Sequence, residues 1–167
     1  MTDQLTRPAP FRLDPADITL DVSTRGARVK WVMVIDDALA PGIAANAAGC
    51  LAAAVGGRVP GILGPDGTDA AGGDHPGLPW TGCSILGADG ATLRRIREKA
   101  LGKDGILLVD MPRAAQVSRV YQGYLETLAA TDPADMEYNG ISLLGPRNKI
   151  DKIVGRLPLL GAAPAGA

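Results

Sequence analysis

The stretch that most constrains the fold is residues 30–55, KWVMVIDDALAPGIAANAAGCLAAAV, which changes from strand-like to helix-like across a Pro-Gly break. Residues 29–35 are apolar with little alternation, as in a strand that is buried on both faces. Asp36 and Asp37 end this strand, and Pro41-Gly42 forms a turn. From Ile43 onward, apolar residues recur every three to four positions, which predicts a helix of roughly 13 residues.

The rest of the chain continues the alternation of strands and helices. We expect strands at residues 80–86, 105–110 and 138–144, and helices at 91–101, 117–131 and 148–154. Arg97 belongs to the charged, solvent-facing side of its helix. The residues whose spacing indicates the third helix are Val117, Tyr121, Tyr124, Leu125 and Leu128. This order predicts an α/β fold: a three-layer α/β/α sandwich with a mixed, mostly parallel sheet of about four strands.

A chain of 167 residues fits one domain with a sizeable core. We place a single α/β domain at residues 28–160. Residues 1–27, with several prolines and charges, are expected to form a mobile arm, and an added edge strand near residues 18–22 is the alternative. Residues 161–167 form a flexible tail. Residues 59–79 are rich in Gly and Pro and should form a loop that holds at most a short hairpin.

Composition excludes several classes of protein. The net charge of −1 gives no bulk attraction to nucleic acid, so no DNA partner is expected. No run of 18 apolar residues and no N-terminal signal pattern occur, so we expect no membrane association and a cytoplasmic location. Cys50 and Cys83 are interpreted as buried thiols. With one histidine and no CxxC, P-loop or dinucleotide motif, no metal or cofactor is expected.

Three polar residues suggest a ligand site. Asp36 and Asp110 each end a predicted strand, and Asn46 lies in the first turn of the helix that follows the first of them. Ligands of open α/β sheets bind beyond the carboxyl ends of the strands, and helix N-termini favour anions. The three side chains are therefore expected to share one hollow, with helix capping and turn stabilisation as the alternative. If the three side chains form a ligand site, Asp110→Asn or Asn46→Ala abolishes ligand binding and leaves the melting temperature nearly unchanged.

Two further groups carry a functional and an ordinary interpretation. His75, in the segment GGDHPG, is the one histidine of the sequence, and histidine is the residue type suited to proton transfer near neutral pH. It is therefore a candidate general base or, with Asp66, Asp69 and Asp74 nearby in the sequence, a candidate ligand of a divalent cation. Segments rich in Gly and Asp are also ordinary turns. The cations of the last predicted helix can meet phosphate or simply form a solvated face. They are Arg147, Lys149, Lys152 and Arg156.

Four segments together carry a family resemblance: residues 30–55, 74–77 (DHPG), 107–112 (LLVDMP) and 140–160 (GISLLGPRNKIDKIVGRLPLL). Over about residues 28–160 the chain resembles the bacterial family called domain of unknown function 2000. That family is similar in fold to the type 2 peptidyl-tRNA hydrolases, which implies an α/β/α sandwich and often a homodimer. No reaction is established for the family.

The sequence keeps residues of the hydrolase pattern that belong to the scaffold, which we call frame positions, and lacks those that would take part in the reaction. Frame positions that match the hydrolase pattern are Lys30, Gly42, Asp110 and Arg113. The two loop lysines, the histidine and the threonine of the hydrolases fall on Ile43, Ala45, Ala52 and Ala114. Loss of a cation and a neutral-pH base removes stabilisation worth several kcal/mol. Peptidyl-tRNA hydrolysis by the ordinary route is therefore not expected.

The sequence leads to three functional hypotheses. The first is a ligand-binding protein on the hydrolase-like scaffold, whose ligand is a small molecule or RNA-linked and is held by Asp36, Gly42, Asn46 and Arg113. The second is a hydrolase of an ester or amide adduct, free or attached to tRNA, that uses Asp110 as a catalytic residue with Lys30 or His75. The third is a dimeric interaction module whose crevice is vestigial.

Overall fold

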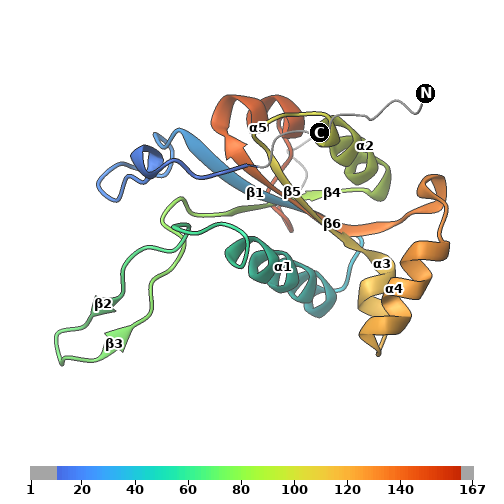
Figure 1. Cartoon of the computed structure of the whole chain (residues 1–167), viewed down its shortest axis with the longest axis horizontal. Coiled ribbons are helices and arrows are strands. Elements are labelled where there is room, and N and C mark those ends of the chain that lie inside the picture. Colours follow the sequence, from blue (N-terminus) through green and yellow to red (C-terminus); the bar gives the residue numbers. More distant parts are fainter. Residues whose placement is uncertain (1–10, 163–167) are drawn as a thin grey trace, which may run out of the picture.

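Four strands form one mixed sheet in the order β4-β1-β6-β5 (Figure 1). The structure is a computed structural model, in which residues 11–162 are described. The strands are β1 (Val29–Asp36), β4 (Ser84–Ala88), β5 (Leu107–Pro112) and β6 (Tyr138–Pro146). Each of them overlaps a predicted strand, and the α/β class with a mixed four-stranded sheet is confirmed.

The expectation of a mostly parallel sheet holds for strand direction but is wrong for strand pairing. β1, β4 and β5 run the same way, whereas β6 runs against them and lies between β1 and β5. Only the β1–β4 pair is therefore parallel. The antiparallel pairing of β5 and β6 follows from the segment that connects them. This segment leaves and re-enters the sheet at the same end, where Pro112 pairs with Tyr138. A helical crossover of the sheet face, as between β1 and β4, would have produced a parallel neighbour.

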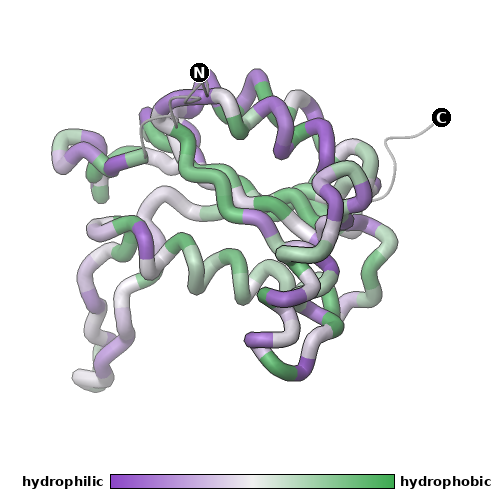
Figure 2. Tube along the Cα trace, turned by 45° about the vertical axis from the view of Figure 1, so that its right-hand side comes forward, coloured by the Kyte–Doolittle hydropathy of each residue, from purple (hydrophilic) through white to green (hydrophobic). Residues whose placement is uncertain are grey.

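The helices cover the sheet on both faces and form the outer two of three layers (Figure 1). α1 (Pro41–Gly56) covers one face, and α2 (Gly90–Leu101) and α5 (Arg147–Val154) cover the other. Trp31 and Met33 of β1 pack on the α1 side, while Val32 and Val34 pack on the α2 and α5 side. This double burial explains the unbroken apolar run in the sequence. Figure 2 shows the same pattern, with the hydrophobic residues concentrated along the central strands.

The predicted third helix, residues 117–131, corresponds to α4 (Tyr121–Ala130), and a short helix that was not predicted, α3 (Arg113–Val117), precedes it. No residue of either helix is buried. Val117 is 70% and Tyr121 76% exposed. The physical reason is their location: both helices lie beyond the end of the sheet rather than over one of its faces (Figure 1).

The described part of the expected N-terminal arm contacts the domain. It holds a short 3-10 helix, η1 (Pro15–Asp17), and Phe11 and Leu13 pack against the α1 side of the core. No strand forms at residues 18–22. The remainder of the arm, residues 1–10, and residues 163–167 of the expected tail lie outside the described residues.

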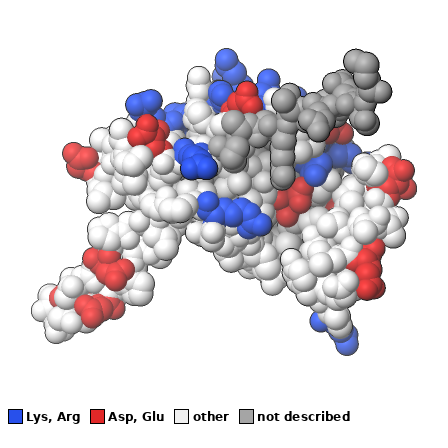
Figure 3. Space-filling model, viewed as in Figure 1, with Lys and Arg blue, Asp and Glu red and all other residues white. Residues whose placement is uncertain are grey.

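A short hairpin projects from the body of the molecule (Figure 1). Its strands are β2 (Gly67–Thr68) and β3 (Asp74–His75), within the segment where at most a short hairpin was expected. Its acidic side chains stand out in Figure 3. A second 3-10 helix, η2 (Pro133–Asp135), leads into β6. Within residues 11–162, no helix has the length and apolar character needed to cross a membrane.

Candidate functional site

The structure does not bring Asp36, Asn46 and Asp110 into one hollow. Asp110 lies on the face of the sheet that α2 covers, where its carboxylate accepts a hydrogen bond of 2.6 Å from Arg97. Asn46 belongs to α1, which covers the opposite face. Asp36 and Asp110 line two separate cavities. The expectation of a shared hollow fails because Asn46 lies in the opposite layer and because β6 separates the strands that carry Asp36 and Asp110.

Asn46 takes part in a chain of side-chain amides that ties three elements together. The Nε2 atom of Gln116, in α3, donates to the Ile43 carbonyl over 2.7 Å and to Asn46 Oδ1 over 3.0 Å. The Nδ2 group of Asn139, in β6, donates in turn to Gln116 Oε1. Asn139 is buried, whereas Asn46 is exposed. These contacts give Asn46 a structural role. Neither Gln116 nor Asn139 was singled out from the sequence.

Asp36 lies near Arg113, as the ligand-binding set requires, but their shared cavity is small. It has a volume of about 150 Å³ and is also lined by Arg94 and Glu137. Arg113 Nη1 lies 3.3 Å from Glu137 Oε2, and Asp36 Oδ1 accepts from the Ala38 N–H at 3.0 Å. Both side chains therefore have local partners. Gly42 lies in the first turn of α1, where an added Cβ would meet nothing within 4 Å.

The proposed catalytic residues Asp110, Lys30 and His75 lie in three different regions. Lys30 Nζ lies 2.6 Å from Asp151 Oδ1 of α5. Lys30 pairs with Gly145 and Asp110 with Ile141, so along β6 they are four positions, or roughly 13 Å, apart. His75 lies in the projecting hairpin, where its side chain is 68% exposed.

The polar groups of the hairpin form hydrogen bonds with one another. His75 Nε2 lies 3.3 Å from Asp69 Oδ2. The Asp69 carboxylate also accepts from the backbone N–H groups of Gly73 and Ala71. The hydrogen bond from Gly73, followed by that from His75, holds the pKa of Asp69 below its ordinary value of 3.8. These contacts stabilise the turn, which is the ordinary interpretation of the GGDHPG segment.

A cavity of about 770 Å³ runs along the outer edge of β5. The strand is at the edge of the sheet and pairs only with β6, so residues 108–112 form one side of the cavity. α1 contributes Cys50, Ala54 and Arg58, α2 contributes Arg97 and Leu101, and the segment from Ala115 to Tyr124 closes the remaining side. We refer to this space as the β5 cavity.

The β5 cavity carries an excess of positive charge. Arg58, Arg97 and Arg119 line it, and Asp110 is the one carboxylate among its lining residues. The positive charge of Arg97 is compensated by the carboxylate of Asp110. The guanidinium carbon of Arg97 also lies 4.9 Å from the centre of the Tyr138 ring. No carboxylate within the described part of the chain pairs with Arg58 or Arg119. Two positive charges at the cavity therefore have no counterion from residues 11–162.

Aromatic rings adjoin these charges. Tyr121 and Tyr124 line the cavity and make an edge-to-face contact, with their centres 5.5 Å apart. Burial raises the pKa of Tyr124, with smaller contributions from Tyr121 and Asp110. The Tyr124 phenol is thus neutral at physiological pH. The sequence indicated both tyrosines only as residues of a helix, and it placed Arg97 on a solvated helix face.

The chemistry available at the β5 cavity is anion binding next to an aromatic surface. Asp110 is engaged by Arg97, so its carboxylate is not a free base. Across residues 11–162, no three His, Cys, Asp or Glu side chains gather to hold a metal ion.

Comparison with known proteins yields a family and one fold relative. A family model described as "Protein of unknown function (DUF2000)" matches residues 29–161. The solved structure of a protein of unknown function, Atu0240 from Agrobacterium tumefaciens strain C58, is similar with a TM-score of 0.73 and 20% sequence identity. The similarity covers 79% of this chain and 97% of that one. None of the curated proteins matches this chain.

Proposed function

The chain belongs to the family described as protein of unknown function (DUF2000), and we propose that its β5 cavity binds a small anionic ligand without catalysing a reaction. The observation that carries the proposal is the charge of the cavity, where three arginines surround one carboxylate. The volume of about 770 Å³ suits a small organic molecule, since such sites span roughly 300–1,000 Å³.

Electrostatics favours an anion at this position. Arg58 and Arg119 have no carboxylate partner within residues 11–162, so an anionic ligand would supply the missing counterion. The guanidinium group binds carboxylate or phosphate in a bidentate manner, and partial enclosure strengthens the attraction relative to open water. The rings of Tyr121 and Tyr124 offer apolar surface to the rest of the ligand.

Binding is favoured over hydrolysis because no second catalytic group accompanies Asp110. Lys30 is paired with Asp151, and His75 lies in the hairpin with Asp69. The alternative of a hydrolase that uses Asp110 with Lys30 or His75 therefore has no shared site from which to act. In the proposal, Asp110 is a positioning residue that holds Arg97 at the cavity wall.

The finer family relationship belongs to the same proposal. We infer a scaffold of the type 2 peptidyl-tRNA hydrolase kind, a cytoplasmic location and a homodimer. The retained frame positions Lys30, Gly42, Asp110 and Arg113 support this scaffold. An RNA-linked ligand would have to place its anionic group in the β5 cavity, and the binding test below includes such a ligand.

Calorimetric titration against aromatic and aliphatic carboxylates, phosphate esters and tRNA tests the proposal. We expect a small anion to bind and the Arg58→Ala/Arg119→Ala variant to bind it at least about tenfold more weakly. Arg95→Ala is the matched control, because Arg95 is an exposed arginine of α2 that does not line the cavity. Unchanged affinity in the double variant would remove the β5 cavity as the site. Preferred binding of tRNA with a steep salt dependence would replace the small molecule with an RNA ligand.

A further inference from the structure

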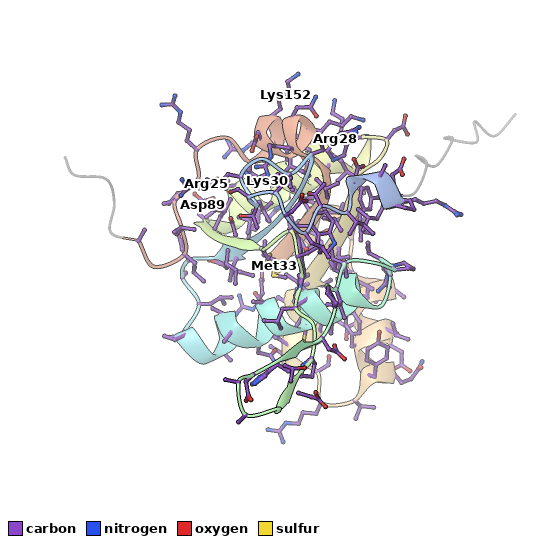
Figure 4. All side chains as sticks on the ribbon, turned by 90° about the vertical axis from the view of Figure 1, so that its left-hand side faces the viewer. Arg25, Arg28, Lys30, Met33, Asp89 and Lys152 are labelled. Carbon is purple, nitrogen blue, oxygen red and sulfur yellow. The ribbon has the colours of Figure 1, made fainter. Side chains whose placement is uncertain are left out.

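A second cavity, of about 360 Å³, lies where β1 and β4 begin. The N-terminal segment contributes Thr24 and Arg25, β1 contributes Lys30, the approach to β4 contributes residues 81–84, and α5 contributes Arg147. Figure 4 shows Arg25 and Lys30 near each other at this end of the molecule. The cavity shares no lining residue with the β5 cavity. We call it the basal cavity.

The basal cavity has three cations and no carboxylate among its lining residues, Arg25, Lys30 and Arg147 being the cations. Lys30 is compensated by Asp151 at 2.6 Å. Arg25 has no ion pair with any residue of the described range 11–162, and the same holds for Arg147. About two positive charges therefore remain without a counterion.

Arg147 is held in place by neutral groups. Its Nε donates to the Ala27 carbonyl over 2.7 Å, and its Nη2 donates to the Thr24 carbonyl over 2.5 Å. Main-chain carbonyls fix the orientation of a guanidinium group without cancelling its charge. The positive charge at the cavity is therefore positioned before any ligand arrives, which lowers the entropy cost of binding.

Neutral donors surround these cations. Thr24 and Ser84 bring hydroxyl groups to the cavity. The ammonium of Lys30 has three protons, and its bond to Asp151 uses one of them. Burial raises the pKa of the Cys83 thiol to about 12, so this residue adds no negative charge. The lining is thus a set of donors with a net positive charge.

We propose that the basal cavity binds the phosphate group of a small phosphorylated molecule. A phosphate monoester is close to a dianion at neutral pH and would compensate both unpaired cations, whereas a carboxylate would compensate one. Arginine, lysine and hydroxyl donors are the usual protein partners of phosphate oxygens. This site is separate from the β5 cavity, and it gives Lys30 a binding role.

Phosphorus NMR and calorimetric titration of the full chain at low ionic strength test this proposal, with inorganic phosphate, glycerol phosphate and acetate as probes. We expect the two phosphates to bind, acetate to bind at least about tenfold more weakly, and Arg25→Ala to weaken phosphate binding about tenfold. Arg25 is exposed, so its replacement should leave the fold intact. Arg25→Lys should retain most of the affinity, and Arg95→Ala should behave as the unmodified protein.

Several outcomes would overturn the proposal. Equal affinity of the Arg25→Ala and unmodified proteins would exclude the basal cavity, as would acetate binding as tightly as phosphate. A short RNA that displaces glycerol phosphate and binds more tightly than it would indicate a nucleic-acid backbone instead of a small molecule. In the Arg58→Ala/Arg119→Ala variant the β5 cavity no longer contributes anion binding. Glycerol phosphate binding that persists in this variant and is weakened by adding Arg25→Ala belongs to the basal cavity, so failure here and failure at the β5 cavity are distinguishable.

Discussion

Arg97 of α2 and Asp110 of β5 form an ion pair of 2.6 Å at the wall of the β5 cavity. Both side chains are about a quarter exposed, at 28% and 25%, so the pair is partly shielded from water. The Arg97 guanidinium also lies over the Tyr138 ring. The contact joins a helix to the edge strand of the sheet, which makes Asp110 a structural partner as well as a cavity residue.

Asp110→Asn should destabilise the protein, because it leaves the partly buried Arg97 without its counterion. We expect a loss of about 1–3 kcal/mol in the free energy of unfolding, measured by urea titration. The Arg97→Met/Asp110→Leu variant should lose less than the sum of its single changes. This expectation replaces the one drawn from the sequence, in which Asp110→Asn leaves the melting temperature nearly unchanged. An unaltered urea midpoint for Asp110→Asn would show that the ion pair contributes nothing.

Gln116→Leu should also destabilise the protein. The change removes hydrogen bonds to Ile43 and Asn46 and leaves the buried amide of Asn139 without its acceptor. A loss of about 1–3 kcal/mol in the free energy of unfolding is expected from urea titration. Gln122→Leu is the control, since Gln122 is exposed and makes one long contact of 3.4 Å with Glu126. Similar stability of the two variants would contradict the role given to the amide chain.

Asp89→Ala should lower the melting temperature at neutral pH by about 2–4 °C, because Asp89 Oδ1 caps α2 by accepting from the Thr92 N–H at 2.7 Å. That hydrogen bond lowers the pKa of Asp89 from 3.8. A lowered pKa means that the stabilisation is present above the ordinary value and is lost as pH falls through the folded-state value. The gap between the variant and the unmodified protein should therefore close in strong acid. A gap that persists there would indicate an effect other than the charged cap.

Two glycine-to-alanine changes should have opposite effects. A Cβ at Gly145 would lie 2.7 Å from the Gly105 carbonyl oxygen, so Gly145→Ala should cost about 1–3 kcal/mol of stability. A Cβ at Gly49, on the exposed side of α1, would meet nothing within 4 Å. Gly49→Ala should therefore stabilise the protein by about 0.5–1 kcal/mol through higher helix propensity. Urea titration of both variants measures the two changes, and the same sign for both would be inconsistent with this packing.

The two thiols should differ in reactivity. The interpretation of Cys50 as a buried thiol is wrong, because Cys50 is exposed and lines the β5 cavity. Burial raises the pKa of Cys83 to about 12 and keeps it protonated. At mildly alkaline pH, iodoacetamide should modify Cys50 rapidly and Cys83 hardly at all, as measured by mass spectrometry. The Cys83→Ser protein should react as the unmodified one does. Rapid labelling of the Cys50→Ser protein would show that Cys83 is accessible and ionised after all.

The sequence predicted those elements whose hydrophobic pattern is local and strong. The apolar run of β1 and the helical spacing in α1 and α2 identify these elements because each one buries apolar side chains in the core. The helices α3 and α4 show the limit of this reasoning. Their apolar spacing is also helical, yet no residue in them is buried, since spacing alone does not say whether a partner surface exists.

The candidate site shows the same division. The sequence identified Asp110 as a residue of interest, but its partner Arg97 looked like part of a solvated helix face. The sequence determined the class of fold and the elements with a strong apolar pattern. Only the tertiary structure decided that β6 lies between β1 and β5, that Asp110 and Asn46 face opposite layers, and that arginines gather along β5. The reason is physical: apolar periodicity is set by near neighbours in the chain, whereas strand pairing and cavity charge depend on residues far apart in it.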